Sequence, residues 1–166
     1  MQRTESAKLN PVVRRFVEHA GNLTQSFGIG RVLGQIYAYL FFSRVPRTLA
    51  DLQDALGISK GSASMGVRQL EQWGAVHKVW VKGDRKDYYQ GNDWFGRILK
   101  NACVDTVGQK MAAYTALLED MRSDLPGALS ANGDGEFIKS RIEQLRRFQT
   151  KAQKIWGSRL FQHLLH

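Results

Sequence analysis

Along the first 45 residues, apolar positions recur at the three- and four-residue spacing of α-helices. The first stripe follows Asn10-Pro11, a pair typical of a helix start, because Asn can cap the helix and Pro needs no donor at its first position. Its apolar members are Val13, Phe16, Val17, Ala20, Leu23 and Phe27. Gly28 is expected to end this helix. A second helix is predicted from about residue 31 to 43, apolar on most of its surface and therefore largely buried, before Pro46 interrupts the chain.

The next segment predicts two short helices and a hairpin. Thr48 is placed to cap a helix over 49–56, and Ser59 to cap another over 60–73, with Gly57 in the turn between them. After Gly74 the helical period gives way to residues with high β-propensity over 75–81. A polar turn over 82–86 and a return strand over 87–90 complete a β-hairpin.

From Trp94 onwards the helical period returns. A long helix is predicted through Met121, followed by a break over 124–135, where Pro126 and three glycines lie. A last helix is predicted over 136–165, with about eight turns of apolar stripe. A stripe that long in a small protein favours a partner helix, although it could also pack on its own chain.

Composition narrows the class of protein. The 166 residues suit one domain, or one domain with an oligomerisation extension, and 24 Lys and Arg against 15 Asp and Glu give a net charge of +9. Such an excess favours polyanionic partners. A single cysteine, Cys103, excludes an intramolecular disulfide and a zinc site built on several thiolates. The amino terminus does not resemble a signal peptide and no apolar stretch could span a bilayer, so a cytoplasmic protein without a membrane partner is expected.

No pattern invites a catalytic, cofactor or metal assignment, and the chain is not expected to be an enzyme. No Ser/His/Asp set or carboxylate pair clusters in any segment. His19 and His77 have no partners at metal-ligand spacing, and His163 and His166, three residues apart, lie at the end of the sequence, where metal binding is not expected. Gly28-x-Gly30-x-x-x-Gly34 resembles a dinucleotide fingerprint, but a helix rather than a strand precedes it. Gly30 and Gly34 are instead expected to permit close helix packing.

The order of short helix, glycine turn, capped helix and hairpin is that of a winged helix-turn-helix. In this layout the 60–73 helix buries Ala63, Val67 and Leu70 and offers its other face to the major groove of DNA. Ser59 and Lys60 are placed to hold a phosphate at the helix start, and Arg68 and Gln69 to reach base edges. The predicted DNA-contacting residues of this segment are Ser59, Lys60, Gly61, Ser62, Ser64, Met65, Arg68 and Gln69.

The turn over 82–86 is the predicted wing. It carries three cations, Lys82, Arg85 and Lys86, which would contact phosphates or enter the minor groove, and Arg85 is the expected inserted side chain. Asp84 is interpreted as wing support, an orienting partner for an arginine rather than a DNA contact. The alternative is that the segment is an ordinary charged, solvated turn.

Three stretches, GIGRVLGQIYAYL (28–40), LADLQDALGISKGSASMGVRQLEQWGAV (49–76) and VWVKGDRKDYY (79–89), resemble the GbsR subfamily of MarR-type transcriptional regulators. The resemblance implies a homodimer in which the terminal helices interlock and each protomer projects one winged helix at a DNA half-site. It also implies Arg85 at the wing tip, supported by Asp84. Some members of the family sense choline, so a choline-like effector is a hypothesis. Several aromatic residues could contribute to its binding or simply to the core: Tyr37, Tyr39, Trp73, Trp80, Trp94 and Phe95.

The expected fold is therefore mainly α with a small β-hairpin wing. It comprises a winged helix-turn-helix over 28–91 and a helical dimerisation region over 1–27 and 92–166. The residues expected at the dimer interface are Phe16, Ile138, Ile142, Leu145, Phe148 and Ile155. The expected function is sequence-specific binding of a pseudo-palindromic operator by a homodimeric transcriptional regulator, a repressor that could respond to a ligand. The alternative is a winged helix used as a protein–protein interaction module.

Overall fold

The computed structural model describes residues 9–132, 134–156 and 158. Its chain divides into two compact units, Met1–Ala102 and Cys103–His166. The first helix belongs to the same unit as the winged segment, so this division does not coincide with the boundaries at residues 27 and 91 that the sequence suggested. The two units are described separately below.

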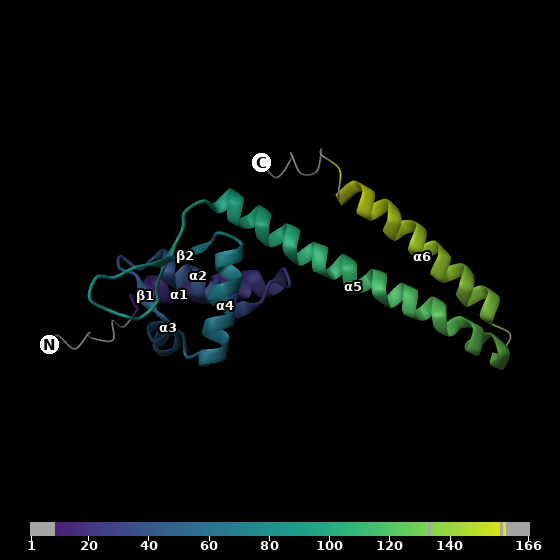
Figure 1. Ribbon diagram of the computed structural model, residues 1–166, viewed down its shortest axis with the longest axis horizontal. Helices are drawn as coiled ribbons and strands as arrows, with labels where there is room; N and C mark the ends of the chain where they lie inside the picture. Colours follow the sequence, from purple (N-terminus) through teal and green to yellow (C-terminus); the bar gives the residue numbers. More distant parts are fainter. Residues whose placement is uncertain (1–8, 133, 157, 159–166) are drawn as a thin grey trace. The chain divides into compact units, whose positions relative to one another are not determined.

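The first unit contains the predicted helices and a small sheet (Figure 1). Its elements are α1 (Pro11–Ser26), α2 (Arg31–Phe41), β1 (Arg47–Thr48), α3 (Leu49–Leu56), α4 (Lys60–Gln72), β2 (Val76–Val79), β3 (Tyr88–Gly91) and the first turns of α5 (Phe95–Asn132). A mainly helical fold with a β wing is thereby confirmed.

Side-chain caps set the starts of α1, α3 and α4, as the sequence predicted. Asn10 accepts a hydrogen bond at its Oδ1 from the Val12 N–H, with Pro11 as the first residue of α1. Thr48 and Asp51 form a reciprocal capping box at the start of α3. Each such cap satisfies backbone donors that the first helical turn leaves unpaired. Gly57 ends α3 in the left-handed conformation, at φ 64°, which allows the chain to turn directly into α4.

The sheet has three antiparallel strands in the order β1-β3-β2. In the hairpin, Lys78 lies opposite Tyr89 and Val79 opposite Tyr88. An ion pair between Lys78 Nζ and Asp87 Oδ2, 3.0 Å long, spans the two sides of the hairpin. The sequence did not predict β1, because a strand of two residues shows no alternation of polar and apolar positions.

The core of this unit is built around α2. Ile36 and Leu40 of α2, Leu52 of α3 and Val67 of α4 are all fully buried. The helices approach closely at glycines: a Cβ on Gly34 would lie 2.8 Å from the Ala20 carbonyl carbon of α1. Gly34 therefore permits close helix packing, as expected. Gly30 does not, because nothing lies within 4 Å of its Cβ position; its φ of 111° serves the turn before α2 instead.

The second unit is a helical hairpin made of the rest of α5 and of α6 (Gly135–Trp156). Arg146 Nη2 lies 3.1 Å from Glu119 Oε1, and Gln153 donates to the Thr115 hydroxyl at 3.2 Å, so α6 runs back along α5. The predicted break over 124–135 is confirmed only at its end, because α5 continues through Pro126 to Asn132 and α6 begins at Gly135. A proline removes one backbone donor and crowds one carbonyl, which a long helix tolerates when its other residues favour it. The part of the last predicted helix beyond residue 158 lies outside the described residues.

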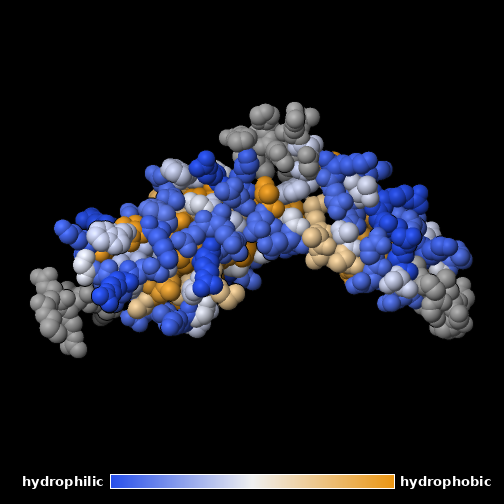
Figure 2. Space-filling model, viewed as in Figure 1, coloured by the Kyte–Doolittle hydropathy of each residue, from blue (hydrophilic) through white to orange (hydrophobic). Residues whose placement is uncertain are grey.

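The surface in Figure 2 is mainly hydrophilic, with apolar side chains reaching it in patches. No helix within the described residues is both long enough and apolar enough to cross a bilayer.

Candidate nucleic-acid interface

Helix α4 has one buried and one exposed face. Ala63, Gly66, Val67 and Leu70 are buried against the core. The residues predicted to contact DNA lie on the opposite side: Lys60, Gly61, Met65 and Arg68 are exposed, and Ser62, Ser64 and Gln69 are partly exposed. The predicted division of the helix into a core face and an outer face is therefore what the structure shows.

The start of α4 is held by a serine pair. The Ser59 Oγ accepts the Ser62 N–H at 3.1 Å and donates to the Ser62 Oγ at 2.9 Å. The Ser59 hydroxyl proton is thus engaged within the protein, whereas the Ser62 hydroxyl can donate outward. With the exposed Lys60 beside it, this first turn presents the donors that suit a phosphate oxygen.

Helix α3 braces α4 from behind. Leu52 is fully buried, and Leu56 and Ile58 pack against the same core as Val67. This packing fixes the direction in which the exposed face of α4 points, because the buried residues of both helices interlock in one cluster.

The wing between β2 and β3 exposes all three predicted cations, Lys82, Arg85 and Lys86. Asp84 shapes this turn, but not through an arginine side chain as expected. Its Oδ1 accepts the Lys86 N–H at 3.0 Å, and its Oδ2 accepts the Tyr88 hydroxyl at 2.8 Å. The hydrogen bond from the Lys86 N–H, and then that from the Tyr88 hydroxyl, lower the pKa of the Asp84 carboxyl below its ordinary value.

The sequence did not assign Trp80 to this surface. Trp80 lies directly after β2 at the base of the wing and is 79% exposed, and it is not among the described residues that line the cavity of the first unit. Trp94 is also largely exposed, and Tyr39 is buried in the core, with the Arg47 guanidinium 5.8 Å above its ring. Trp80 could have been assigned to the wing from the sequence, because it lies two residues before Lys82, the first cation of the basic turn.

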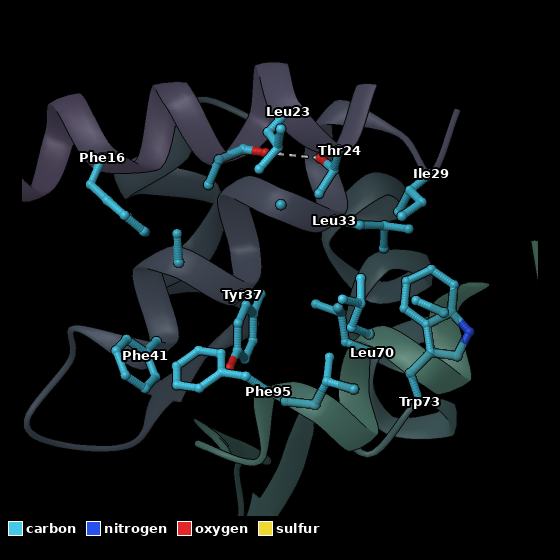
Figure 3. Close-up of a pocket in the computed structure, with 16 residues that line it drawn as sticks. Phe16, Leu23, Thr24, Ile29, Leu33, Tyr37, Phe41, Leu70, Trp73 and Phe95 are labelled. Atoms are coloured by element: carbon cyan, nitrogen blue, oxygen red, sulfur yellow. Dashed lines mark hydrogen bonds between the residues drawn. The ribbon is translucent and has the colours of Figure 1, made fainter. Parts of the chain in front are cut away.

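A cavity of about 380 Å³ lies in the first unit, beside the last turn of α4. Figure 3 shows the labelled side chains arranged around it. Of the six aromatic residues that the sequence suggested for a pocket, three line this cavity: Tyr37, Trp73 and Phe95. Phe16, Leu33, Phe41 and Leu70 are among the other lining residues.

The polar groups in the cavity wall are already paired within the protein. The Tyr37 hydroxyl donates to the Asn92 carbonyl at 2.7 Å, and the Thr24 hydroxyl lies within hydrogen-bond distance of three backbone carbonyls, including that of Gly30 at 2.9 Å. Burial, reinforced by the negative charge of Asp93, raises the pKa of Tyr37 to about 12. Among the described residues that line the cavity, none has a charged side chain. The described wall therefore offers shape and aromatic rings but no counter-charge, and its two hydroxyl groups are both paired within the protein.

The residues expected at a dimer interface differ in exposure. Phe16 of α1 and four residues of α6 are exposed: Ile138, Leu145, Phe148 and Ile155. Ile142 is only 3% exposed within its own chain. It is therefore already buried within its own chain and is not exposed to a partner.

No metal site emerges either: among the described residues, no three His, Cys, Asp or Glu side chains come together in a way that could hold an ion.

The relatives of the chain are bacterial regulators. The transcriptional repressor OpcR of Bacillus subtilis is 29% identical over 145 residues, which cover 87% of this chain and 78% of OpcR. The transcriptional repressor GbsR of the same bacterium is 27% identical over 136 residues, covering 81% of this chain and 75% of GbsR. This chain is a homologue of HTH-type transcriptional regulators.

A third relative, the transcriptional regulator YvaV of Bacillus subtilis, is 33% identical over 75 residues. That match covers 45% of this chain and spans less than half of YvaV, 42% of its length. A crystal structure of a transcriptional regulator superposes with a TM-score of 0.51 at 21% identity, covering 89% of this chain and 97% of that one, which supports the fold. No family model matches the chain.

Proposed function

We propose that this protein is a sequence-specific DNA-binding transcriptional regulator that acts as a repressor in the cytoplasm. The observation that carries the proposal is the outer surface of the winged helix-turn-helix. There, the polar face of α4 and a wing with three exposed cations belong to the same compact unit. The homology to HTH-type repressors supports it.

In the proposed complex, α4 enters the major groove and the wing lies over the adjacent minor groove. Lys60 and the first turn of α4 contact a phosphate, Arg68 and Gln69 contact base edges, and Arg85 enters the minor groove. Asp84 holds the wing turn through its two hydrogen bonds, which leaves the cationic side chains pointing outward.

We also propose that the protein acts as a homodimer. Phe148 of α6 is 72% exposed, and Ile155 of α6 and Phe16 of α1 are exposed as well, so these apolar side chains are available to pack against a second copy of the chain. A twofold dimer would read two half-sites with centres about 34–36 Å apart. Sedimentation at micromolar concentration should show a species of twice 18.8 kDa, and a single 18.8 kDa species would contradict the dimer.

The alternative, a protein–protein interaction module, requires an apolar outer face on α4. The exposed face is instead polar or cationic except at Met65, which disfavours this reading.

A ligand response is supported by the cavity, because Leu70 and Trp73 at the end of α4 form part of its wall. A choline-like effector would be stabilised there by aromatic faces alone, since the part of the wall that the structure describes contains no carboxylate. A neutral apolar molecule fits the chemistry better. Calorimetry with choline, glycine betaine and an uncharged aromatic compound of similar size separates these cases, and heat only with the uncharged compound is the expected result.

The DNA-binding proposal is tested by selecting bound fragments from the source genome and measuring the affinity of variants for them in gel shifts. Arg85→Ala should weaken binding broadly and reduce the salt slope by about one if Arg85, in the minor groove, neutralises the charge of one phosphate. Arg68→Ala should instead cost about 1–3 kcal/mol at particular base pairs.

Arg122→Ala is the matched control, since Arg122 is an exposed arginine of the second unit that forms an ion pair with the nearby Glu119. If all three variants bind as the wild type does, the proposed surface is wrong.

A further inference from the structure

Met65 is an apolar side chain at the centre of an otherwise polar surface. It is 72% exposed, the highest value among the large apolar residues of the helix-turn-helix. Successive helix residues are rotated by about 100°, so Met65 points within about 30° of the direction opposite the buried residues Ala63, Gly66, Val67 and Leu70. An exposed apolar side chain has no role in the fold at this position.

The helix cannot rotate to bury Met65. A Cβ on Gly66 would lie 2.6 Å from Ile36 Cδ1, and Ile36 is fully buried, so α4 is seated as closely on α2 as its glycine allows. On the outer face, Gly61 and Ser62 lie one turn before Met65 and are both short. The Met65 side chain therefore projects beyond its neighbours on that side, and Arg68 follows one turn later.

We propose, on the basis of the regulator function above, that Met65 reads the 5-methyl group of a thymine in the major groove. Among the unmodified bases, only thymine presents an apolar group there; the other base edges present donors and acceptors. A thioether is at best a weak acceptor, so it gains little from those edges or from phosphates. Its flexible, polarisable side chain suits contact with a methyl group. Arg68 and Met65 would thus read adjacent positions by different chemistry.

The test uses an operator fragment selected from the source genome, in which each thymine in turn is replaced by deoxyuridine. This change removes the methyl group and keeps every hydrogen-bonding group. Loss of one buried methyl contact should weaken binding of the wild type by about fourfold, and replacement in both half-sites by about sixteenfold. Met65→Ala should bind the thymine and deoxyuridine operators equally well. Met65→Leu, which keeps an apolar side chain, should retain the difference.

Each contrary result has a distinct meaning. Equal binding of all thymine and deoxyuridine operators by the wild type overturns the assignment. A deoxyuridine penalty that persists in Met65→Ala also overturns it, since the methyl would then act through DNA shape or another residue. If Met65→Ala binds every operator as the wild type does, Met65 makes no contact that matters for DNA affinity, and the assignment is overturned as well. Failure of the wild type to bind any fragment removes the proposed function itself, not merely the role of Met65.

Discussion

Replacing Gly34 by alanine should separate two helices that now touch through their backbones. Gly34 lies on α2 against α1, where a Cβ would be 2.8 Å from the carbonyl carbon of Ala20 and nearer still to its oxygen and to the Thr24 hydroxyl. A backbone carbonyl cannot rotate away as a side chain can. The helices would have to move apart by on the order of 1 Å to restore ordinary carbon–carbon distances.

Three effects set the size of the change. Overpacking a close-packed contact costs about 1–3 kcal/mol. The Thr24 hydroxyl donates to backbone carbonyls, and displacing it would weaken this hydrogen bonding at a cost of about 1 kcal/mol. Alanine regains about 1 kcal/mol through its higher helix propensity. Gly34→Ala should therefore be destabilising by about 2 kcal/mol, which corresponds to a fall in Tm of about 4–8 °C for a chain of this size.

Gly108→Ala is the matched control. Gly108 lies inside α5, and nothing lies within 4 Å of its Cβ position, so alanine there should raise stability by up to about 1 kcal/mol. Urea denaturation followed by circular dichroism, at one fixed protein concentration, measures both changes. If Gly34→Ala is as stable as the wild type, or if both substitutions shift stability in the same direction, the close contact between α1 and α2 is not as described.

Two further predictions concern ionisable groups. The Asp84 carboxylate accepts a hydrogen bond from the Tyr88 hydroxyl and raises the pKa of that phenol, so Asp84→Asn should lower the pKa of Tyr88. An alkaline titration followed by tyrosine absorbance should then show one phenol of the variant ionising at lower pH than in the wild type. An unchanged curve would contradict the hydrogen bond. Burial raises the pKa of Tyr37 in the folded protein to about 12, compared with a pKa near 10 in the unfolded chain. The stability that the neutral, buried phenol contributes is therefore complete below pH 10 and is lost as the pH rises towards 12. Tyr37→Phe should flatten the fall in stability over that range, and equal slopes for the two proteins would argue against a buried phenol.

The sequence predicted the parts of the fold that depend on local chemistry. Asn10, Thr48 and Ser59 are capping residues placed directly before apolar periods, and all three caps form as expected. The exposed face of α4 followed from the spacing of Ala63, Val67 and Leu70 alone. Which of the exposed residues contact DNA stays a prediction.

Features that depend on distant contacts could not be predicted in this way. Strand β1 exists only because residue 47 lies opposite Tyr89, more than 40 positions later. The cavity wall combines residues of α1, α2, α4 and α5, and no single segment shows that they meet. The partners of Asp84 were also missed, because charge alone suggested an arginine, whereas the turn brings the Tyr88 hydroxyl and the Lys86 N–H to the carboxylate.

These contacts make α4 the element through which the proposed ligand and DNA would affect one another. Gly66 seats the middle of the helix on Ile36, and Leu70 and Trp73 at its end face the cavity. A helix of 13 residues moves as a rigid body, so a ligand that displaced Trp73 would tilt the outer face that carries Met65 and Arg68. The effect on DNA affinity is limited by the ligand's own preference between two conformations of the protein. The ligand can lower DNA affinity only by the factor by which it binds the conformation with displaced Trp73 more tightly than the DNA-bound conformation.

A ligand that fills the cavity without moving α4 would therefore stabilise the protein against urea and leave operator affinity unchanged. Measuring both quantities with the same compound distinguishes an effector from a passive occupant.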